Sequence, residues 1–170
     1  RRLHSGFGAG LYVMLFLIRP LLERFSGRLT YGFAQRLRRY PDEVRAAEDV
    51  QTVWLHASSV GEVQAAIDLV HALLPFLGPR RIVVTSMTEQ GHRLADSRMP
   101  DKVLCLMAPL DLPQAVSNAL RSIRPCCYIC LETELWPVML TRVRQTGIPM
   151  LLLNGRLSQR SFHRYQYIRH

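Results

Sequence analysis

Two loops of this sequence carry carboxylates, and each loop follows a short apolar segment. Glu62 follows the loop Ala57-Ser-Ser-Val-Gly61, and Glu132 follows the apolar run 126–131, with Glu134 two residues further on. A carboxylate beside a glycine at the start of a helix is accessible enough to take a proton as a general base. Two carboxylates after a buried strand, with no cation nearby in the sequence, are costly unless they are partnered or used in chemistry. These loops are therefore the first candidates for a functional site.

The first loop also has a purely structural interpretation. Ser58 or Ser59 is a typical helix N-cap, and a glutamate in the first helical turn is favoured by the helix dipole. Taken alone, this loop favours the capping role. The loop with Glu132 and Glu134 is harder to explain in this way, although Trp136 and the proline after it fit an ordinary helix start in the core.

Two further loops carry polar groups after an apolar run. One spans 85–91 and includes Thr88, and the other spans 154–161 and includes Arg156 and Ser158. Hydroxyl and guanidinium groups of this kind bind sugar hydroxyls or phosphates. Each loop is weak evidence by itself, but four polar loops on the same edge of one sheet form a cleft.

The elements that must position these loops follow from the pattern beyond residue 50. Continuous apolar strands that alternate with helices are typical of a parallel sheet covered on both faces. We therefore predict an α/β, Rossmann-like domain over residues 50–170, with ligands bound beyond the carboxyl ends of the strands. The expected strands are 52–56, 81–85, 103–107, 126–131 and 148–153, and the expected helices are 62–77, 89–96, 113–122 and 137–145.

The first 45 residues have a different composition. Residues 6–18 form an apolar run that is shorter than the roughly 20 residues a spanning helix needs. Nine arginines face three acidic residues over 1–45, and basic segments bind anionic headgroups or phosphate backbones. We predict an apolar helix plus an Arg-rich membrane-associating segment over 1–45, with 6–45 at the membrane surface. A helix packed on the domain is the alternative, whereas a signal peptide is disfavoured because no small-residue cleavage site follows.

Composition and motifs argue against several other classes. The net charge is +9, but the basic segment adjoins an apolar run and has little aromatic interleaving, so a nucleic-acid binder is disfavoured. A nucleotide-binding oxidoreductase lacks support because the sequence has neither GxGxxG after a strand nor a P-loop. Cys127-x-x-Cys130 has zinc-like spacing, yet no second pair completes four ligands. We expect buried strand thiols, which fit a reducing, cytosolic compartment.

Five motifs follow one another along the chain. They are His56-Ala-Ser-Ser-Val-Gly-Glu62, Thr85-Ser-Met-Thr88 with Gly91, Leu110-Asp-Leu-Pro113, Glu132-Thr-Glu-Leu-Trp-Pro137 and Asn154-Gly-Arg-Leu-Ser158 with Arg160 and Ser161. In this order and spacing they resemble the 3-deoxy-D-manno-octulosonic acid (Kdo) transferases throughout residues 11–165. Departures are small: Ala57-Ser-Ser59 stands where one branch has Ser-Val-Ser, Leu110 stands for a tyrosine and Gly155 for an alanine.

The resemblance implies the amino-terminal, acceptor-side domain of a two-domain GT-B glycosyltransferase, preceded by a membrane-associating helix. Such enzymes transfer Kdo from CMP-Kdo to lipid IVA, a lipid A precursor, in lipopolysaccharide synthesis at the cytoplasmic face of the bacterial inner membrane. The transfer inverts the anomeric centre and requires no metal or other cofactor. The donor-binding carboxy-terminal domain is missing from this chain, so we expect the chain alone to be inactive.

The same resemblance assigns roles to individual residues. Glu62 is the expected general base, and Glu132 is expected to stabilise the transition state or to organise the base. The alternative function is a non-catalytic membrane-peripheral module that binds a phosphorylated lipid, which has no need of both glutamates. Contacts to the acceptor or to other substrate groups are expected from Ser58, Ser59, Gly61, Thr88, Glu134, Arg156 and Ser158.

Overall fold

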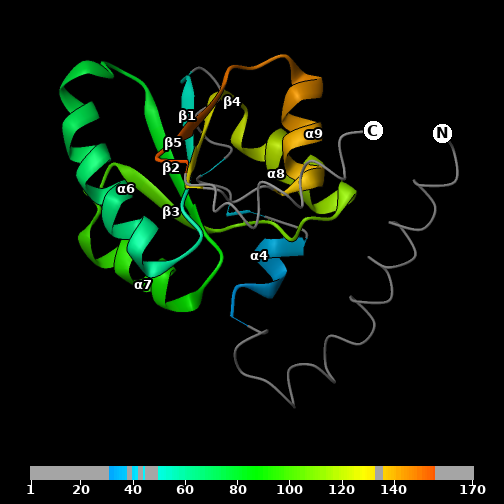
Figure 1. The fold of residues 1–170 in the computed structure, drawn as a ribbon, viewed down its shortest axis with the longest axis horizontal. Helices are drawn as coiled ribbons and strands as arrows, with labels where there is room; N and C mark the ends of the chain where they lie inside the picture. The colour runs from blue at the N-terminus through cyan, green and yellow to red at the C-terminus, as the bar shows by residue number, and fades with distance from the viewer. Residues whose placement is uncertain (1–30, 38–39, 42–43, 45–49, 133–135, 156–170) are drawn as a thin grey trace, which may run out of the picture.

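The chain forms a five-stranded sheet flanked by helices (Figure 1). The computed structural model describes residues 31–37, 40–41, 44, 50–132 and 136–155. The described elements are α4 (Phe33–Leu37), β1 (Thr52–His56), α6 (Val60–Leu73), the 3-10 turn η1 (Leu74–Phe76), β2 (Arg81–Ser86), α7 (Glu89–Arg98), β3 (Val103–Met107), α8 (Pro113–Ile123), β4 (Pro125–Leu131), α9 (Pro137–Thr146) and β5 (Met150–Leu153).

The sheet has the strand order β3-β2-β1-β4-β5, and every neighbouring pair is parallel. The chain moves outward from β1 to β2 and β3, then returns past β1 to β4 and moves outward again. This is the doubly wound arrangement of Rossmann-like domains. The predicted α/β class with a parallel sheet is therefore confirmed, and the predicted strands lie within one or two residues of the observed ones.

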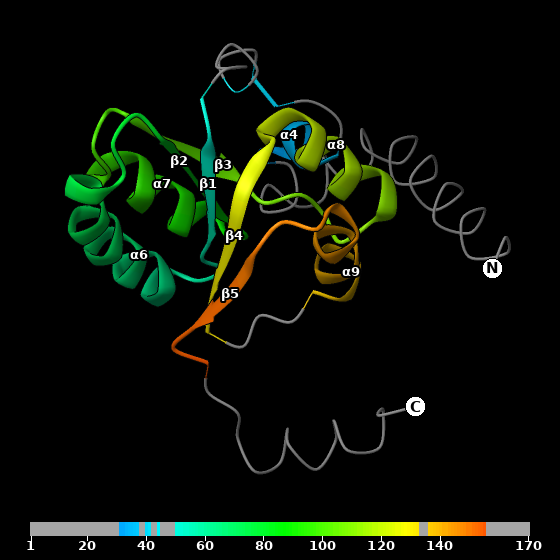
Figure 2. The ribbon, with the colours of Figure 1, turned by 90° about the horizontal axis from the view of Figure 1, so that it is seen from above.

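Helices cover both faces of the sheet, as Figure 2 shows. On one face α6 and α7 pack against side chains such as Leu55, Val84 and Ile129. On the other face α8 and α9 pack against Trp54, Val83 and Tyr128. The two clusters follow the alternation of side chains along each strand, so every central strand contributes to both cores. This explains why these strands read as continuous apolar runs in the sequence.

Trp54 anchors the second core. It is fully buried, its ring meets that of Tyr128 edge to face at 5.2 Å, and its indole N–H donates to Thr85 Oγ1 (2.9 Å). A buried aromatic side chain with a satisfied polar atom contributes large apolar contact without an unpaired donor. The three strands β2, β1 and β4 are thus tied together by side chains as well as by their backbone ladder.

The edge strand β5 differs from its prediction. The sequence predicts a strand over 148–153 in a sheet that is covered on both faces. In the described structure, however, Met150, Leu151 and Leu152 are 43–50% exposed. The strand pairs with β4 on one side, and no described helix packs over its faces as α6 to α9 do over the central strands. An apolar sequence predicts the strand itself, but only the surrounding elements decide its burial.

The boundary at residue 45 is also corrected. Among the described residues of this region, Phe33, Leu37, Tyr40 and Val44 are each 6% exposed or less. Tyr40 and Val44 belong to the core formed with α8 and α9. These four described residues therefore pack into the globular domain and do not face a membrane surface, although they lie within the segment 1–45 predicted to associate with one. The apolar run 6–18 lies outside the described residues.

The cysteine prediction can be compared directly with the strand geometry. Cys126, Cys127 and Cys130 all lie in β4, and Cys127 and Cys130 pack into the cores on opposite faces of the sheet. Two thiols on opposite faces cannot bind one metal ion together. The three thiols lie in a strand as predicted, but only Cys130 is buried, whereas Cys126 and Cys127 are half-buried. Burial also raises the pKa of Cys105 in β3 to about 12.

In the described part of the chain, none of the helices combines the length and the apolar character needed to cross a membrane.

Candidate functional site at the carboxyl edge of the sheet

The site lies where the strand order reverses. Strands β1 and β4 are neighbours, but the chain leaves β1 toward one face and β4 toward the other, so the loops after them diverge. Ligands of doubly wound domains bind at this switch point. The loop 57–62 follows β1 and the loop that begins at Glu132 follows β4, so the two predicted acidic loops are adjacent at this edge.

Glu62 lies in the first turn of α6, where two hydrogen bonds hold its carboxylate. The Ser58 N–H donates to Oε2 (2.6 Å), and the Ser59 hydroxyl donates to Oε1 (2.8 Å). Ser59 Oγ in turn accepts the Glu62 N–H (3.3 Å), so Ser59 is the N-cap. The arrangement resembles a capping box, except that the Glu62 carboxylate accepts the N–H of Ser58 and not that of the N-cap residue. The capping role favoured by the sequence is confirmed. A carboxylate accepts at about four positions, so these bonds leave capacity for a further proton.

The residues around Glu62 differ in exposure. Glu62 and Ser58 are 5% and 7% exposed, whereas Ser59 and Gly61 are exposed. A Cβ atom added at Gly61 would meet nothing within 4 Å, and its backbone is not left-handed. Glycine weakens a helix relative to alanine, and neither backbone conformation nor described packing requires it here. The space around a Cβ at Gly61 is therefore open, whereas the neighbouring Glu62 is less accessible than the sequence predicts.

Thr88 has a structural role at the start of α7. Its hydroxyl accepts the Gly91 N–H (3.1 Å), which makes it the N-cap of that helix. A Cβ atom at Gly91 would lie 2.9 Å from Thr88 Oγ1 and 3.4 Å from Val63 Cγ2, so glycine allows close packing of α7 against α6. The Met87 N–H donates to Ser58 O (3.2 Å) and joins this loop to the loop after β1.

Glu132 adopts an unusual backbone conformation at the end of β4. Its φ angle is +57°, in the left-handed region that non-glycine residues seldom occupy. Its N–H donates to Leu153 O (2.8 Å), which fixes the turn against β5. The side chain is half-buried. A strained residue that keeps a functional group where glycine would be favoured is typical of functional sites.

His56 and Trp136 meet at a small cavity of about 10 Å³ at this edge. His56 Nδ1 lies 3.0 Å from Thr85 Oγ1, while His56 Nε2 and Trp136 Nε1 have no hydrogen-bonding partner in the described structure. Burial lowers the pKa of His56 from 6.5 to about 4. Buried polar atoms are normally satisfied, so these two nitrogens are exceptions within the described core. Its lining residues are His56, Met87, Ala108, Pro109, Asp111, Trp136 and Met139.

Asp111 is a residue of this edge to which the sequence analysis gave no role. Its two carboxylate oxygens accept the N–H groups of Val138 (3.1 Å) and Met139 (2.8 Å), in the first turn of α9. Trp136 occupies the N-cap position without a side-chain hydrogen bond, so Asp111 supplies the cap from the loop after β3. The only signal in the sequence was its place in the motif Leu110-Asp-Leu-Pro113.

Three predicted site residues, Glu134, Arg156 and Ser158, lie outside the described residues. The structure therefore brings together Ser58, Ser59, Gly61 and Glu62 after β1, and places Thr88 and Glu132 at the ends of the two strands beside it.

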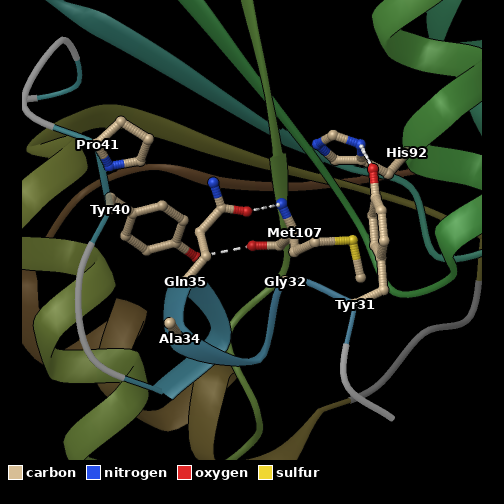
Figure 3. A pocket seen from close by; sticks show the side chains of 8 residues that line it. All are labelled: Tyr31, Gly32, Ala34, Gln35, Tyr40, Pro41, His92 and Met107. Carbon is tan, nitrogen blue, oxygen red and sulfur yellow. Dashed lines mark hydrogen bonds between the residues drawn. The ribbon is translucent and has the colours of Figure 1, made fainter. Parts of the chain in front are cut away.

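A larger cavity among the described residues lies elsewhere, between α4, β3 and α7 (Figure 3). It has a volume of about 590 Å³ and is open to solvent. Gln35 Oε1 accepts the Met107 N–H (2.7 Å), and the Tyr40 hydroxyl donates to Met107 O (3.0 Å), so the segment around α4 pairs with the outer edge of β3. None of the residues that line this cavity is acidic, whereas the switch point has Glu62 and Glu132.

The structure defines a Rossmann-like α/β domain with polar loops at the switch point of its sheet. Residues 31–170 match the family described as 3-deoxy-D-manno-octulosonic-acid transferase (kdotransferase). The chain belongs to this family, as its motifs predicted.

Curated relatives agree with this assignment. The chain is 35% identical over 161 residues to a 3-deoxy-D-manno-octulosonic acid transferase of Haemophilus influenzae, a match that covers 92% of this chain and 38% of the relative. It is 30% identical over 158 residues to the transferase of Chlamydophila psittaci, covering 92% and 36%. It is 36% identical over 112 residues to the transferase of Bordetella pertussis, covering 64% and 26%. The chain thus spans less than two-fifths of the length of these relatives.

The buried histidine gives the domain a specific pH dependence. Between about pH 6.5 and pH 4, the unfolded chain takes up a proton at His56 while the folded chain does not. Stability therefore falls as the pH drops through this window, by roughly 1.4 kcal/mol per pH unit for this group. We expect the variant His56→Asn, which can keep the bond to Thr85, to lack this component. Urea unfolding of both proteins at several pH values measures it, and parallel pH profiles would contradict it.

The left-handed conformation of Glu132 predicts a gain in stability on substitution by glycine. Glu132→Gly should raise the free energy of unfolding by roughly 0.5–1 kcal/mol because the backbone strain is relieved. Glu132→Ala loses the same carboxylate but keeps the strain, so it is the matched control and should show no gain. Denaturant unfolding distinguishes the two variants. Equal stabilities for the glycine and alanine variants would show that the strain is absent.

Proposed function

We propose that this chain is the amino-terminal, acceptor-side part of an inverting Kdo transferase with Glu62 as its general base. The donor is CMP-Kdo, the acceptor is lipid IVA, and the product enters lipopolysaccharide synthesis. The observation that carries the proposal is the Glu62 carboxylate, oriented by two hydrogen bonds at the switch point of the sheet, in a chain that belongs to the Kdo transferase family.

The proposed reaction is a single displacement. The Glu62 carboxylate takes the proton of an acceptor hydroxyl as the hydroxyl oxygen forms a bond to the anomeric carbon of Kdo. The bond between that carbon and the phosphate oxygen of CMP breaks, and CMP leaves with the electron pair. Attack opposite the leaving group inverts the anomeric centre. The open space beside Gly61 is the route by which the hydroxyl reaches the carboxylate.

The capping bonds support this role as well as the helix. They fix the rotamer of Glu62, and a base held in one orientation loses little freedom when the substrate binds. Ser58 contributes its backbone N–H and Ser59 its hydroxyl to this arrangement, so in this proposal both position the base beside the acceptor. Thr88 and Glu134 complete the acceptor contacts, and Arg156 and Ser158 bind a phosphate or carboxylate.

Glu132 acts on the other side of the switch point in this proposal. Positive charge develops on the sugar ring in an oxocarbenium-like transition state, and a nearby carboxylate stabilises it. Its place after β4, the strand beside β1, and its strained backbone support this assignment. The mechanism uses no metal or other cofactor, and the donor is held by a carboxy-terminal domain, so the chain alone transfers no Kdo.

The rival proposal is a non-catalytic membrane-peripheral module that binds a phosphorylated lipid. Such a module requires basic groups and an apolar anchor but no oriented carboxylate at the switch point. The geometry of Glu62 therefore favours the enzyme.

Substitution of Glu62 in the complete enzyme tests the mechanism. A glutamine can accept from Ser58 and donate to Ser59, so Glu62→Gln should keep the cap and reduce stability by only about 0.3–1 kcal/mol. Loss of the base should reduce kcat by roughly 10²–10⁴-fold. Turnover of CMP-Kdo with lipid IVA measures the rate, and circular dichroism checks the fold.

Glu89→Gln is the matched control, because Glu89 also lies in the first turn of a helix and pairs with Arg93 on the surface (2.8 Å). It should leave turnover unchanged. Near-normal turnover in folded Glu62→Gln enzyme would end the proposed mechanism. The double variant with Glu132→Gln should lose less than the product of the two single losses, since residues of one catalytic unit are not additive.

Membrane association at the cytoplasmic face of the inner membrane is proposed from the sequence of residues 1–30. These residues contain the apolar run 6–18 and five arginines against one glutamate. We expect the 170-residue chain to sediment with phosphatidylglycerol vesicles, more weakly as salt is added. A chain that starts at residue 31 keeps the core contacts of Phe33 and Leu37 and should remain in the supernatant. Equal sedimentation of the two chains would contradict the proposal.

A further inference from the structure

Arg36 is a buried cation at the same edge of the sheet as the proposed active site. The side chain is 7% exposed, although the sequence analysis had placed it in a segment facing lipid headgroups. Its Nε donates to Ala108 O (3.3 Å), in the loop after β3, and one terminal nitrogen lies 3.7 Å from the Met87 sulfur, in the loop after β2. The guanidinium therefore reaches the carboxyl ends of two neighbouring strands.

No carboxylate among the described residues pairs with this guanidinium, and burial lowers its pKa from the usual value. A buried charge without a partner is destabilising, and guanidinium groups favour planar, bidentate contact with carboxylate or phosphate. A thioether is a weak acceptor, so the bond to Met87 is a poor substitute for an oxyanion.

The surroundings of Arg36 contain an unsatisfied donor. Met87 and Ala108, the two residues that bind Arg36, also line the small cavity shared by His56 and Trp136. The indole N–H of Trp136 can only donate, and it has no acceptor within the described residues. Met87 thus contacts the Arg36 guanidinium and also lines the cavity to which the unpaired Trp136 belongs. Met87 is half-buried, and methionine side chains change conformation readily.

We propose that Arg36 is the anchor of an oxyanion subsite, in which a phosphate or carboxylate oxygen of a substrate replaces the Met87 sulfur and is bound by the guanidinium, with the Trp136 N–H as a second donor. The identity of the ligand rests on the proposed function, since both substrates of a Kdo transferase carry such groups. Binding to Arg36 is measurable without turnover, so its failure is distinguishable from failure of the catalytic proposal.

The test is ligand binding to the 170-residue chain by isothermal titration calorimetry, at constant ionic strength set with potassium chloride. The probes are inorganic phosphate, glucosamine 1-phosphate as a fragment of the acceptor, and free Kdo as the carboxylate of the donor. Arg36→Met removes the charge and keeps an apolar stem, and we expect it to weaken binding about tenfold or more. Arg121→Met, at an exposed arginine of α8, is the control and should bind as the wild type does.

The pattern among the probes assigns the source of the oxyanion. Binding of glucosamine 1-phosphate but not Kdo identifies the acceptor phosphate, and the reverse identifies the donor carboxylate. Met87→Leu, which removes the competing sulfur, should bind at least as tightly as the wild type. Arg36→Lys keeps the charge without the bidentate geometry and should bind several-fold more weakly. If Arg36→Met does not fold, the weaker binding expected of Arg36→Lys tests the proposal in its place.

A purely structural role for Arg36 predicts a different outcome. In that case Arg36→Met and Arg36→Lys would lower thermal stability equally with and without phosphate, and folded variants would bind the probes as Arg121→Met does. In the proposed subsite, added phosphate raises the melting temperature of the wild type and not that of Arg36→Met. Absence of binding of all three probes to the wild-type chain would also overturn the proposal.

Discussion

The reversal of strand order between β1 and β4 is the constraint on which the rest of the molecule depends. Parallel strands require crossover connections, and these have one hand, so reversing the direction of travel sends the next helices to the opposite face. Helices α6 and α7 therefore cover one face, and α8 and α9 cover the other. The loops after β1 and β4 diverge at the carboxyl ends of these strands. Polar groups from both halves of the described sheet can approach one substrate there without crossing the sheet.

At that edge, folding and chemistry use the same atoms. The capping bonds that start α6 also orient Glu62, and the loop after β3 caps α9 through Asp111. Each loop is thus fixed by a helix end as well as by a strand end. A rigid edge of this kind can hold reactive groups in place before the substrate arrives. This edge also holds features that reduce the stability of the fold. They are the left-handed backbone of Glu132, the buried charge of Arg36 and the unpaired nitrogens of His56 and Trp136.

Much of this arrangement could be predicted from the sequence because its signals are local. Apolar runs such as 81–85 predicted the strands, and the spacing of Ser59 and Glu62 predicted the cap. The remainder depends on contacts between distant segments. Asp111 caps a helix that begins 26 residues later, which no local pattern indicates. The arginines around residue 36 obscured the apolar positions Phe33 and Leu37, so a core segment was assigned to the membrane surface. The backbone strain at Glu132 arises in the turn after β4, which is bonded to the distant strand β5, so no local sequence pattern predicts it.

Strand β5 has a consequence for handling the isolated chain. It is the last strand of the described sheet, it is nearly half exposed from Met150 to Leu152, and its outer backbone groups pair with no other described strand. Flat, apolar strands at the rim of a sheet act as templates for edge-to-edge association with a second molecule, and natural proteins usually protect them with charge, proline or a covering element. Met150 to Leu153 carry neither charge nor proline. Within the described part of the chain, this rim is therefore where edge-to-edge association is expected to start, on the strand whose last residue accepts the Glu132 N–H.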